Sequence, residues 1–238
     1  MTVECESLRD SVKIVVTNAR RLFEDAKRME EWESFPTAHA LCILSQEEYG
    51  KAFLLHLSAE QMIPWSPSVQ RGLNSHTCKQ LMALMLEYIH RKDLLELRDD
   101  PNSFRGASVL PEYIVDAVHI VVLEHFKGWT RADWVYENER KVHTLANRIA
   151  RGVLNREKQT GLYVHIGPDG AVRKQPGLID TNRCRAEMSR TERVSNAFWF
   201  YEDKVNLGAS FDWEKVTAMF QLLTGTMSAE EFENNWWA

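Results

Sequence analysis

The spacing of apolar residues is the feature that most restricts the fold of this chain. From Leu8 to about Met29 they recur every three or four positions, the repeat of one helix face. Only 11 glycines and 7 prolines interrupt the 238 residues, so strong helix formers dominate. Long helices with short connections predict an all-α fold, an antiparallel helical bundle. Further helices are predicted at 36–61, 75–97, 111–127, 131–151, 180–205, 212–223 and 228–235.

One segment departs from the helical pattern. Apolar and polar residues alternate from Thr160 to Ile166, a turn signal follows at Gly167–Gly170, and AVRK comes next, which predicts a small β-hairpin. We therefore expect a single domain over 1–238, with a bundle core at 1–155, a hairpin insertion at 156–178 and C-terminal helices at 179–238 that pack on the bundle. Pro64 and Pro67 predict a linker before the third helix.

The chain lacks the sequence signals of membrane and metal proteins. No apolar run reaches the roughly 18 residues that a membrane span needs, and the charged start MTVECESLRD has no signal-peptide core. We therefore expect a cytoplasmic protein without a membrane partner. Cys5, Cys42, Cys78 and Cys184 stand singly, which indicates neither a zinc knuckle nor a disulfide framework. No metal and no cofactor is expected.

Charged residues interrupt the apolar run of the second predicted helix, ALCILSQEEYGKAFLLHL. At 100° per residue Glu47, Glu48 and Lys51 interleave with leucines and form no separate polar face. Glu47 and Lys51, at i and i+4, could simply pair at the helix margin. Alternatively, the charges enter a partly dry interior. Buried charges are costly unless they are paired and hydrogen-bonded, so charges at such positions usually serve a function. Gly50 favours the second interpretation, because a mid-helix glycine costs about 1 kcal/mol and permits a close approach.

A second group of reactive side chains opens the third predicted helix. His76 and Lys79 share a face near its N-terminus, where the helix dipole attracts anions such as phosphate. Together with Glu47, Glu48 and Lys51 they would form an acid–base site with a phosphate clamp, although the sequence does not place them in contact. His76 could also be an ordinary capping histidine. A metal-dependent phosphohydrolase, with His76, Glu47 and Glu48 as ligands, is a weaker alternative, because no H-x-x-x-H or H-D element supports it.

Positive charge is concentrated in one part of an acidic chain. Residues 140–193 hold twelve Arg and Lys against five Asp and Glu, whereas the whole chain has a net charge of −5. Such asymmetry is typical of a surface that faces nucleic acid, and it also arises from solvated helix faces. Arg-rich helices beside Tyr163 would suit a structured RNA that is held by its phosphates.

Four motifs in order resemble those of a known family. They are Asn18-Ala19 with Leu22 and Ala26; S-x-E-E-x-G-K-A at 45–52; His76-x-x-Lys79; and K-x-x-G-L-Y-V at 158–164, ahead of a turn and Pro176. From about residue 15 to about residue 180 the chain resembles the AbiV family of abortive infection proteins, which belongs to the HEPN superfamily of helical bundles. The E-E-x-G-K element is the most specific of these motifs.

The resemblance implies a function, a site and partners. The fold would be an elaborated four-helix bundle, often dimeric, that arrests growth or translation in phage-infected bacteria. HEPN proteins are frequently metal-independent ribonucleases, in which an Arg-x4–6-His motif cleaves RNA with the 2′-hydroxyl as nucleophile. By resemblance, His76 would be the general base or acid. The other expected catalytic residues are Glu47, Glu48, Lys51, Lys79 and Arg71, and the expected RNA-binding residues are Lys158, Tyr163, Arg183, Arg185 and Arg190. The partners would be tRNA or rRNA, a second copy of the chain and a phage protein that acts as a trigger.

The nuclease motif departs from the pattern of the superfamily. Arg71 to His76 is the single Arg-x4–6-His match in the chain, and Gly72 replaces the usual polar residue after the arginine. The match also opens the third helix, whereas HEPN nucleases usually carry the motif near the last bundle helix. A different class of function therefore stays open: a defence protein without catalysis that binds a phage or host protein. In that case the internal charges would be structural.

Overall fold

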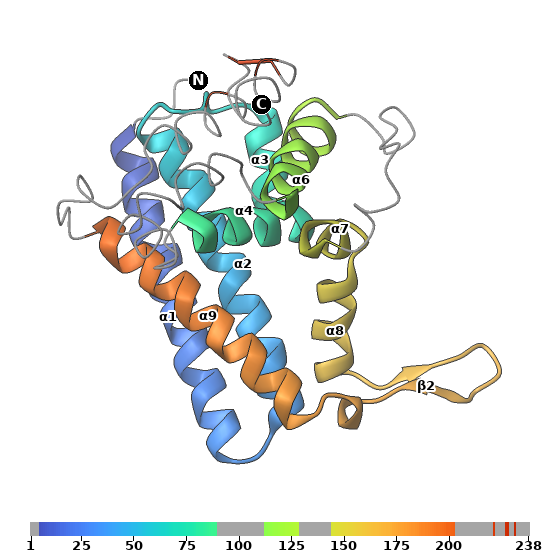
Figure 1. Ribbon diagram of the computed structural model, residues 1–238. Coiled ribbons are helices and arrows are strands. Elements are labelled where there is room, and N and C mark those ends of the chain that lie inside the picture. The colour runs from blue at the N-terminus through green and yellow to red at the C-terminus, as the bar shows by residue number, and fades with distance from the viewer. Residues whose placement is uncertain are drawn as a thin grey trace, which may run out of the picture.

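The structure is a helical assembly with one small β-hairpin (Figure 1). This computed structural model describes residues 5–89, 112–128 and 144–202, with the isolated positions 221, 227–228 and 231. The elements in chain order are α1 (Cys5–Glu31), α2 (Phe35–Ala59), α3 (Pro67–Asn74), α4 (His76–Ile89), α6 (Glu112–Ile120), the π-helix η2 (Val121–Phe126), α7 (Leu145–Ala150), α8 (Val153–Leu162), β1 (His165–Ile166), β2 (Val172–Lys174), the 3₁₀-helix η4 (Pro176–Leu178) and α9 (Thr181–Glu202).

Helix α2 is the central element of the fold. It packs against α1, α4, α8 and α9, and its residues are buried on nearly every side (Figure 1). A helix surrounded by other helices needs apolar residues all round, which explains why α2 has no distinct polar face. Although it is apolar, α2 is interrupted by charges. None of the helices in the described ranges is long and apolar enough to cross a membrane.

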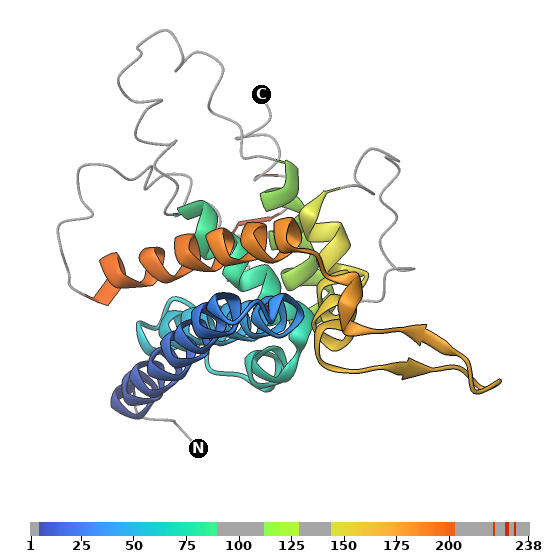
Figure 2. The same ribbon diagram turned by 90° about the horizontal axis from the view of Figure 1, so that it is seen from below.

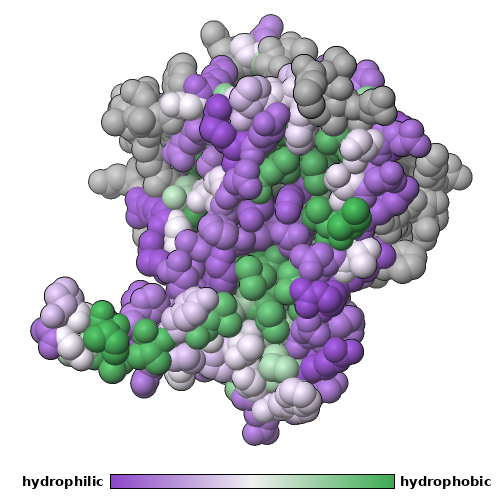
Figure 3. All heavy atoms as spheres, turned by 180° about the vertical axis from the view of Figure 1, so that it is seen from behind, coloured by the Kyte–Doolittle hydropathy of each residue, from purple (hydrophilic) through white to green (hydrophobic). Residues whose placement is uncertain are grey.

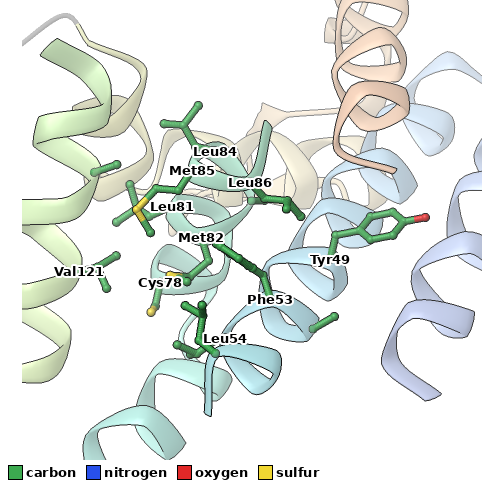
Figure 4. Close-up of a cluster of buried hydrophobic side chains, with 14 of the residues drawn as sticks. Tyr49, Phe53, Leu54, Cys78, Leu81, Met82, Leu84, Met85, Leu86 and Val121 are labelled. Carbon is green, nitrogen blue, oxygen red and sulfur yellow. The ribbon is translucent and has the colours of Figure 1, made fainter. Parts of the chain in front are cut away.

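One part of the main hydrophobic core lies where α2 meets α4 and η2. Phe53 and Leu54 of α2 pack with Leu81 and Met82 of α4, and Val121 of η2 closes the cluster (Figure 4). Each of these side chains is almost fully buried. Burial of a side chain of this size contributes about 1.5–3 kcal/mol. The contact between α2 and α4 is therefore a firm base for the polar residues that the same two helices carry.

The prediction of a mostly α-helical fold is confirmed, and the ends of the long helices lie close to the predicted ones. The helices predicted at 8–29, 36–61 and 180–205 are α1, α2 and α9, and the helix predicted at 111–127 is α6 with its π-helical continuation. The helix predicted from residue 75 begins at His76 and is described to Ile89. Of the helix predicted at 131–151, the structure describes α7. The helices predicted at 212–223 and 228–235 fall largely outside the described residues.

The prediction of a linker at Pro64 and Pro67 is wrong in its second half, because Pro67 begins α3. The side chain of Ser66 accepts a hydrogen bond from the backbone N–H of Val69. Ser66 is thus an N-cap, and a proline at the first helical position loses no backbone hydrogen bond. Ser66 and Pro67 together therefore form the start of a helix and not a linker.

The predicted hairpin exists but is shorter than expected. Gly152, with a φ of 69°, ends α7, and the chain then forms α8 up to Leu162. The expected insertion at 156–178 thus begins inside a helix, and only 165–166 and 172–174 pair as antiparallel strands. The predicted turn is present, since the N–H of Gly170 bonds to the carbonyl of Gly167. The hairpin projects away from the helices (Figures 1 and 2).

Candidate functional site

The crossing of α2 and α4 depends on Gly50. A Cβ atom at this position would lie 1.9 Å from the carbonyl oxygen of Lys79 and 2.9 Å from the nitrogen of Ala83. Because both neighbours are backbone atoms, only glycine permits this approach. Glu47 stands one helical turn before Gly50, so the close crossing brings its carboxylate against the first turns of α4.

Helix α8 approaches α2 through a second glycine. A Cβ at Gly161 would lie 2.4 Å from the carbonyl oxygen of Pro36, again a backbone atom. Lys158 stands one turn before Gly161, as Glu47 stands one turn before Gly50. The two glycines therefore hold α4 and α8 tightly on α2, and each places a charged residue one turn away at the junction.

Four side chains from α4 and α8 surround Glu47 of α2, and the five residues together are here called the Glu47 cluster: Glu47, His76, Lys79, Gln80 and Lys158. One carboxylate oxygen, Oε1, accepts from Lys158 Nζ at 2.8 Å and from Gln80 Nε2 at 2.8 Å. The other, Oε2, lies 2.6 Å from His76 Nδ1 and 3.4 Å from Lys79 Nζ. The side chain of Glu47 is 2% exposed, whereas that of His76 is 51% exposed. A buried carboxylate thus anchors a histidine ring that stands half in solvent.

The contacts of His76 indicate which of its two ring nitrogens carries the proton. Nδ1 lies near both Glu47 and Lys158, the latter at 3.1 Å, and it cannot donate to one while it accepts from the other. The shorter contact is to an ionised carboxylate, which only accepts, so we assign the proton to Nδ1 and Lys158 as a donor to Glu47. In the neutral ring Nε2 then carries the lone pair. This is the nitrogen that a general base uses.

The charges of the cluster do not cancel. Lys79 and Lys158 bring two positive charges to the single negative charge of Glu47. Burial alone would raise the pKa of Glu47, but hydrogen bonds from Lys158 and His76 and the charges of the two lysines outweigh it. The pKa of Glu47 therefore lies below its ordinary value of 4.5. The surplus positive charge beneath the exposed ring favours an anionic group at this surface.

The lowered pKa of Glu47 predicts how stability depends on pH. A carboxylate whose native pKa is depressed stabilises the fold fully above its unfolded pKa, and this contribution is lost as the pH falls through the native value. We therefore expect the stability difference between the wild type and Glu47→Gln to shrink steadily below pH 4.5. Urea unfolding at a series of acidic pH values measures this difference. A difference that stays constant across this range would contradict the assigned ionic bonds.

Glu48 and Lys51 lie outside the Glu47 cluster. Glu48 accepts a hydrogen bond from Asn18 of α1 at 3.1 Å, and Lys51 lies 3.7 Å from the carboxylate of Glu48. The pairing of Lys51 with Glu47, considered above from the i, i+4 spacing, is wrong. The two adjacent glutamates therefore point to different neighbours, Glu47 to α4 and α8 and Glu48 to α1. Glu48 therefore does not join Glu47 and His76, the other two ligands expected for a metal-dependent hydrolase. No metal-binding group of His, Cys, Asp or Glu occurs among the residues described.

Arg71 is not brought to His76. It belongs to α3, which ends at Asn74, and the extended backbone of Ser75 separates this helix from α4. Its guanidinium donates to the hydroxyl of Ser68 at 2.9 Å. The arginine and histidine of the single Arg-x4–6-His match therefore lie on different helices. The cations near His76 are instead Lys79 and Lys158.

The expected RNA-binding residues fall into two groups. Lys158 and Arg190 are buried: Lys158 belongs to the Glu47 cluster, and Arg190 binds Glu87 of α4 at 3.1 Å. Their side chains hold helices together and do not form an open surface, contrary to the role expected from the sequence. The other three are more exposed. Arg183 pairs with Glu157, Arg185 with Glu30 at 3.3 Å, and Tyr163 is exposed at the start of the hairpin.

Some polar residues of this region were not singled out from the sequence. Gln80 is almost fully buried and follows His76 by four residues, so it faces Glu47 from the same side of α4. His39 is also fully buried, 3.6 Å from a carboxylate oxygen of Glu157, and Arg183 binds the other oxygen. The i, i+4 spacing could have identified Gln80. No local signal joins His39 to α8, because the two residues are far apart in sequence.

The comparisons with known proteins agree with the arrangement of the motifs. A model of the HEPN_AbiV family, described as AbiV, matches residues 7–194. The matched range contains the whole Glu47 cluster, both close-approach glycines and the hairpin. No curated protein and no solved structure is similar enough to the chain to count as a match.

Proposed function

The chain belongs to the AbiV family of abortive infection proteins, and on that premise we propose that it arrests growth or translation in phage-infected cells by cleaving cellular RNA. The cleavage would take place at the Glu47 cluster without a metal ion. The observation that carries this proposal is the exposed ring of His76, anchored through Nδ1 by a buried carboxylate. A ring fixed in this way presents one nitrogen to a substrate.

The cluster contains the groups that RNA cleavage needs. Nε2 of His76 would take the proton of a 2′-hydroxyl, whose oxygen then attacks the adjacent phosphorus while the bond to the 5′-oxygen breaks. The products would be a 2′,3′-cyclic phosphate and a 5′-hydroxyl, the latter protonated by the same ring or by water. Lys79 and Lys158 lie within the cluster, where their charges would stabilise the negative charge that develops on the phosphate.

The surface beyond the cluster supports contact with RNA. Lys158 of the Glu47 cluster lies in α8, and Tyr163 directly follows the end of this helix. Tyr163 is 60% exposed, so a base of a bound RNA could stack on its ring. The exposed Arg185 and the partly exposed Arg183 would contact phosphates further along the strand.

An RNA integrity assay tests the proposal. Purified protein is incubated with total bacterial RNA in EDTA, beside His76→Ala, Lys79→Ala and Lys51→Ala variants whose helical content equals that of the wild type. We expect discrete fragments with the wild type and a rate about a hundredfold lower with His76→Ala. Lys51→Ala is the matched control for Lys79→Ala, because Lys51 pairs with Glu48 outside the cluster. Lys51→Ala should therefore retain cleavage that Lys79→Ala loses.

The second candidate function has its own supporting observation. The carboxylate of Glu47 contacts residues of both α4 and α8. The cluster could therefore serve stability alone, in a defence protein that acts by binding a phage or host protein. Growth arrest in cells separates the two functions. Arrest that persists with folded His76→Ala, together with intact RNA in the assay above, would favour the binding protein and contradict the nuclease.

A further inference from the structure

The hairpin carries exposed apolar side chains away from the body of the molecule. We call residues 163–174 the arm. Tyr163, Val164, Ile166 and Val172 are each more than half exposed, at 60%, 54%, 59% and 57%. Ile166 and Val172 are paired across the two strands, so they share one face. The space-filling view shows this hydrophobic surface along the projecting hairpin (Figure 3).

A ribbon of this size does not stabilise itself well in water. Its strands are two and three residues long, and both of their outer edges are open among the described residues. Isolated two-stranded hairpins are marginally stable, and an apolar face with open edges is the kind of surface that binds another protein. The arm therefore has the physical properties of a docking element that lacks its partner.

A complementary surface lies at the same end of the folded molecule, at the turn between α1 and α2. We call residues 31–33 the corner. Trp32 is 73% exposed, and the exposed carboxylates of Glu31 and Glu33 flank it without an ion pair among the described residues. The arm starts beside this corner, because Gly161 at the end of α8 touches Pro36 at the start of α2. An exposed indole between two carboxylates suits an apolar ribbon with a cation.

The arm supplies that cation. Arg173 pairs with Asp169 of the turn at 2.7 Å, whereas Lys174 is exposed and has no ion pair among the residues described. The arm is thus apolar with an uncompensated positive charge, and the corner is apolar with uncompensated negative charges. The two surfaces match in character, yet the arm extends away from its own corner (Figure 2).

We propose that the arm of one chain docks on the α1–α2 corner of a second copy, in a two-fold symmetric dimer. Both surfaces lie at one end of the molecule, so a two-fold axis near that end allows each copy to give its arm and receive that of its partner. Such an exchange uses the same pair of surfaces twice and closes at two chains. It buries Val164, Ile166 and Val172 against Trp32 and pairs Lys174 with Glu31 or Glu33. The proposal does not depend on the RNA chemistry above.

A second copy explains the arm better than RNA does. Nucleic-acid contacts use cations and stacking aromatic rings, whereas Val164, Ile166 and Val172 offer neither to a phosphate backbone. Tyr163 at the root of the arm remains available to RNA, since the docking residues lie further along the ribbon. The two surfaces can therefore be tested separately with substitutions that leave Tyr163 intact.

The test measures the mass of the full chain by light scattering over a wide range of concentrations. We expect the wild type to be a dimer and Ile166→Asp to raise the dimer dissociation constant by about tenfold or more. Ile14→Asp is the matched control, because Ile14 is 71% exposed on α1, outside both surfaces, and should leave the dimer intact. Ile166 is exposed, so its replacement should leave the unfolding transition of the monomer unchanged.

Charge reversal identifies the partner surface. Lys174→Glu should weaken the dimer. A chain that carries Glu31→Lys and Glu33→Lys in addition to Lys174→Glu should form the dimer again. A monomeric wild type, a dimer indifferent to Ile166→Asp, or a reversal that restores nothing would each overturn the proposal. Loss of RNA binding by Ile166→Asp without a change in mass would assign the arm to RNA instead.

Discussion

Replacing Glu47 by alanine is expected to lower the free energy of unfolding by about 3–5 kcal/mol. The carboxylate is the partner of two buried lysines, and its removal leaves Lys79 and Lys158 without the charge that offsets their desolvation. Gln80 and His76 lose their acceptor as well. Removing one member of a buried ionic group costs more than the group contributes, because the remaining charges are left uncompensated.

Equilibrium unfolding in urea at neutral pH measures this loss, and Glu48→Ala is its matched control. Glu48 is the same residue type, one position along the same helix, but its partners are Asn18 and the partly exposed Lys51. Its loss should therefore cost about 1 kcal/mol or less. Equal effects of the two substitutions would show that Glu47 is not the centre of a buried ionic group.

Gly50→Ala is expected to destabilise the fold by about 3 kcal/mol or more, which is the upper range for overpacking. The added methyl group would meet the backbone of Lys79 and Ala83, which cannot rotate away as a side chain can. The helices α2 and α4 would have to separate, and the contacts of Glu47 with His76 and Gln80 would lengthen with them. Loss of stability and loss of the site should therefore occur together.

Thermal unfolding followed by circular dichroism measures this effect, with Gly177→Ala as the control. A Cβ at Gly177 meets nothing within 4 Å, and its φ is not positive, so alanine should be neutral or slightly stabilising there. If Gly50→Ala were as stable as Gly177→Ala, the close crossing of α2 and α4 would be incorrect.

The sequence predicts the long helices well because their apolar repeats are local. Periodicity is visible within one segment, so α1, α2 and α9 could be placed to within a few residues. The short α3 and α8 were missed because eight or ten residues carry too few repeats to separate a helix from irregular chain. Capping by Ser66 and the left-handed Gly152 mark their starts, and these are signals of single residues.

The candidate site could be predicted from the sequence less completely than the helices. The sequence indicates that charges in α2 are unusual and that Gly50 permits a close approach, and the structure brings Glu47, His76 and Lys79 together at that approach. The sequence does not reveal that Glu47 and Glu48 face different helices, because a helical wheel gives the angle of a residue and not its neighbour. Lys158 reaches Glu47 across 111 positions of the chain. No local pattern predicts a contact over such a separation.

The position of Glu47 has a consequence for genetic selection. Under the growth arrest proposed above, a screen for cells that survive expression of the protein would recover substitutions at Glu47, Gly50 and Gly161 abundantly, because each of them loosens the junction of α2 with α4 or α8. Such survivors would reveal the fold and leave the chemistry undetermined. His76 is the exception, since half of its side chain is in solvent and its loss disturbs packing least. Survivors altered at His76, with protein levels unchanged, would be the informative class.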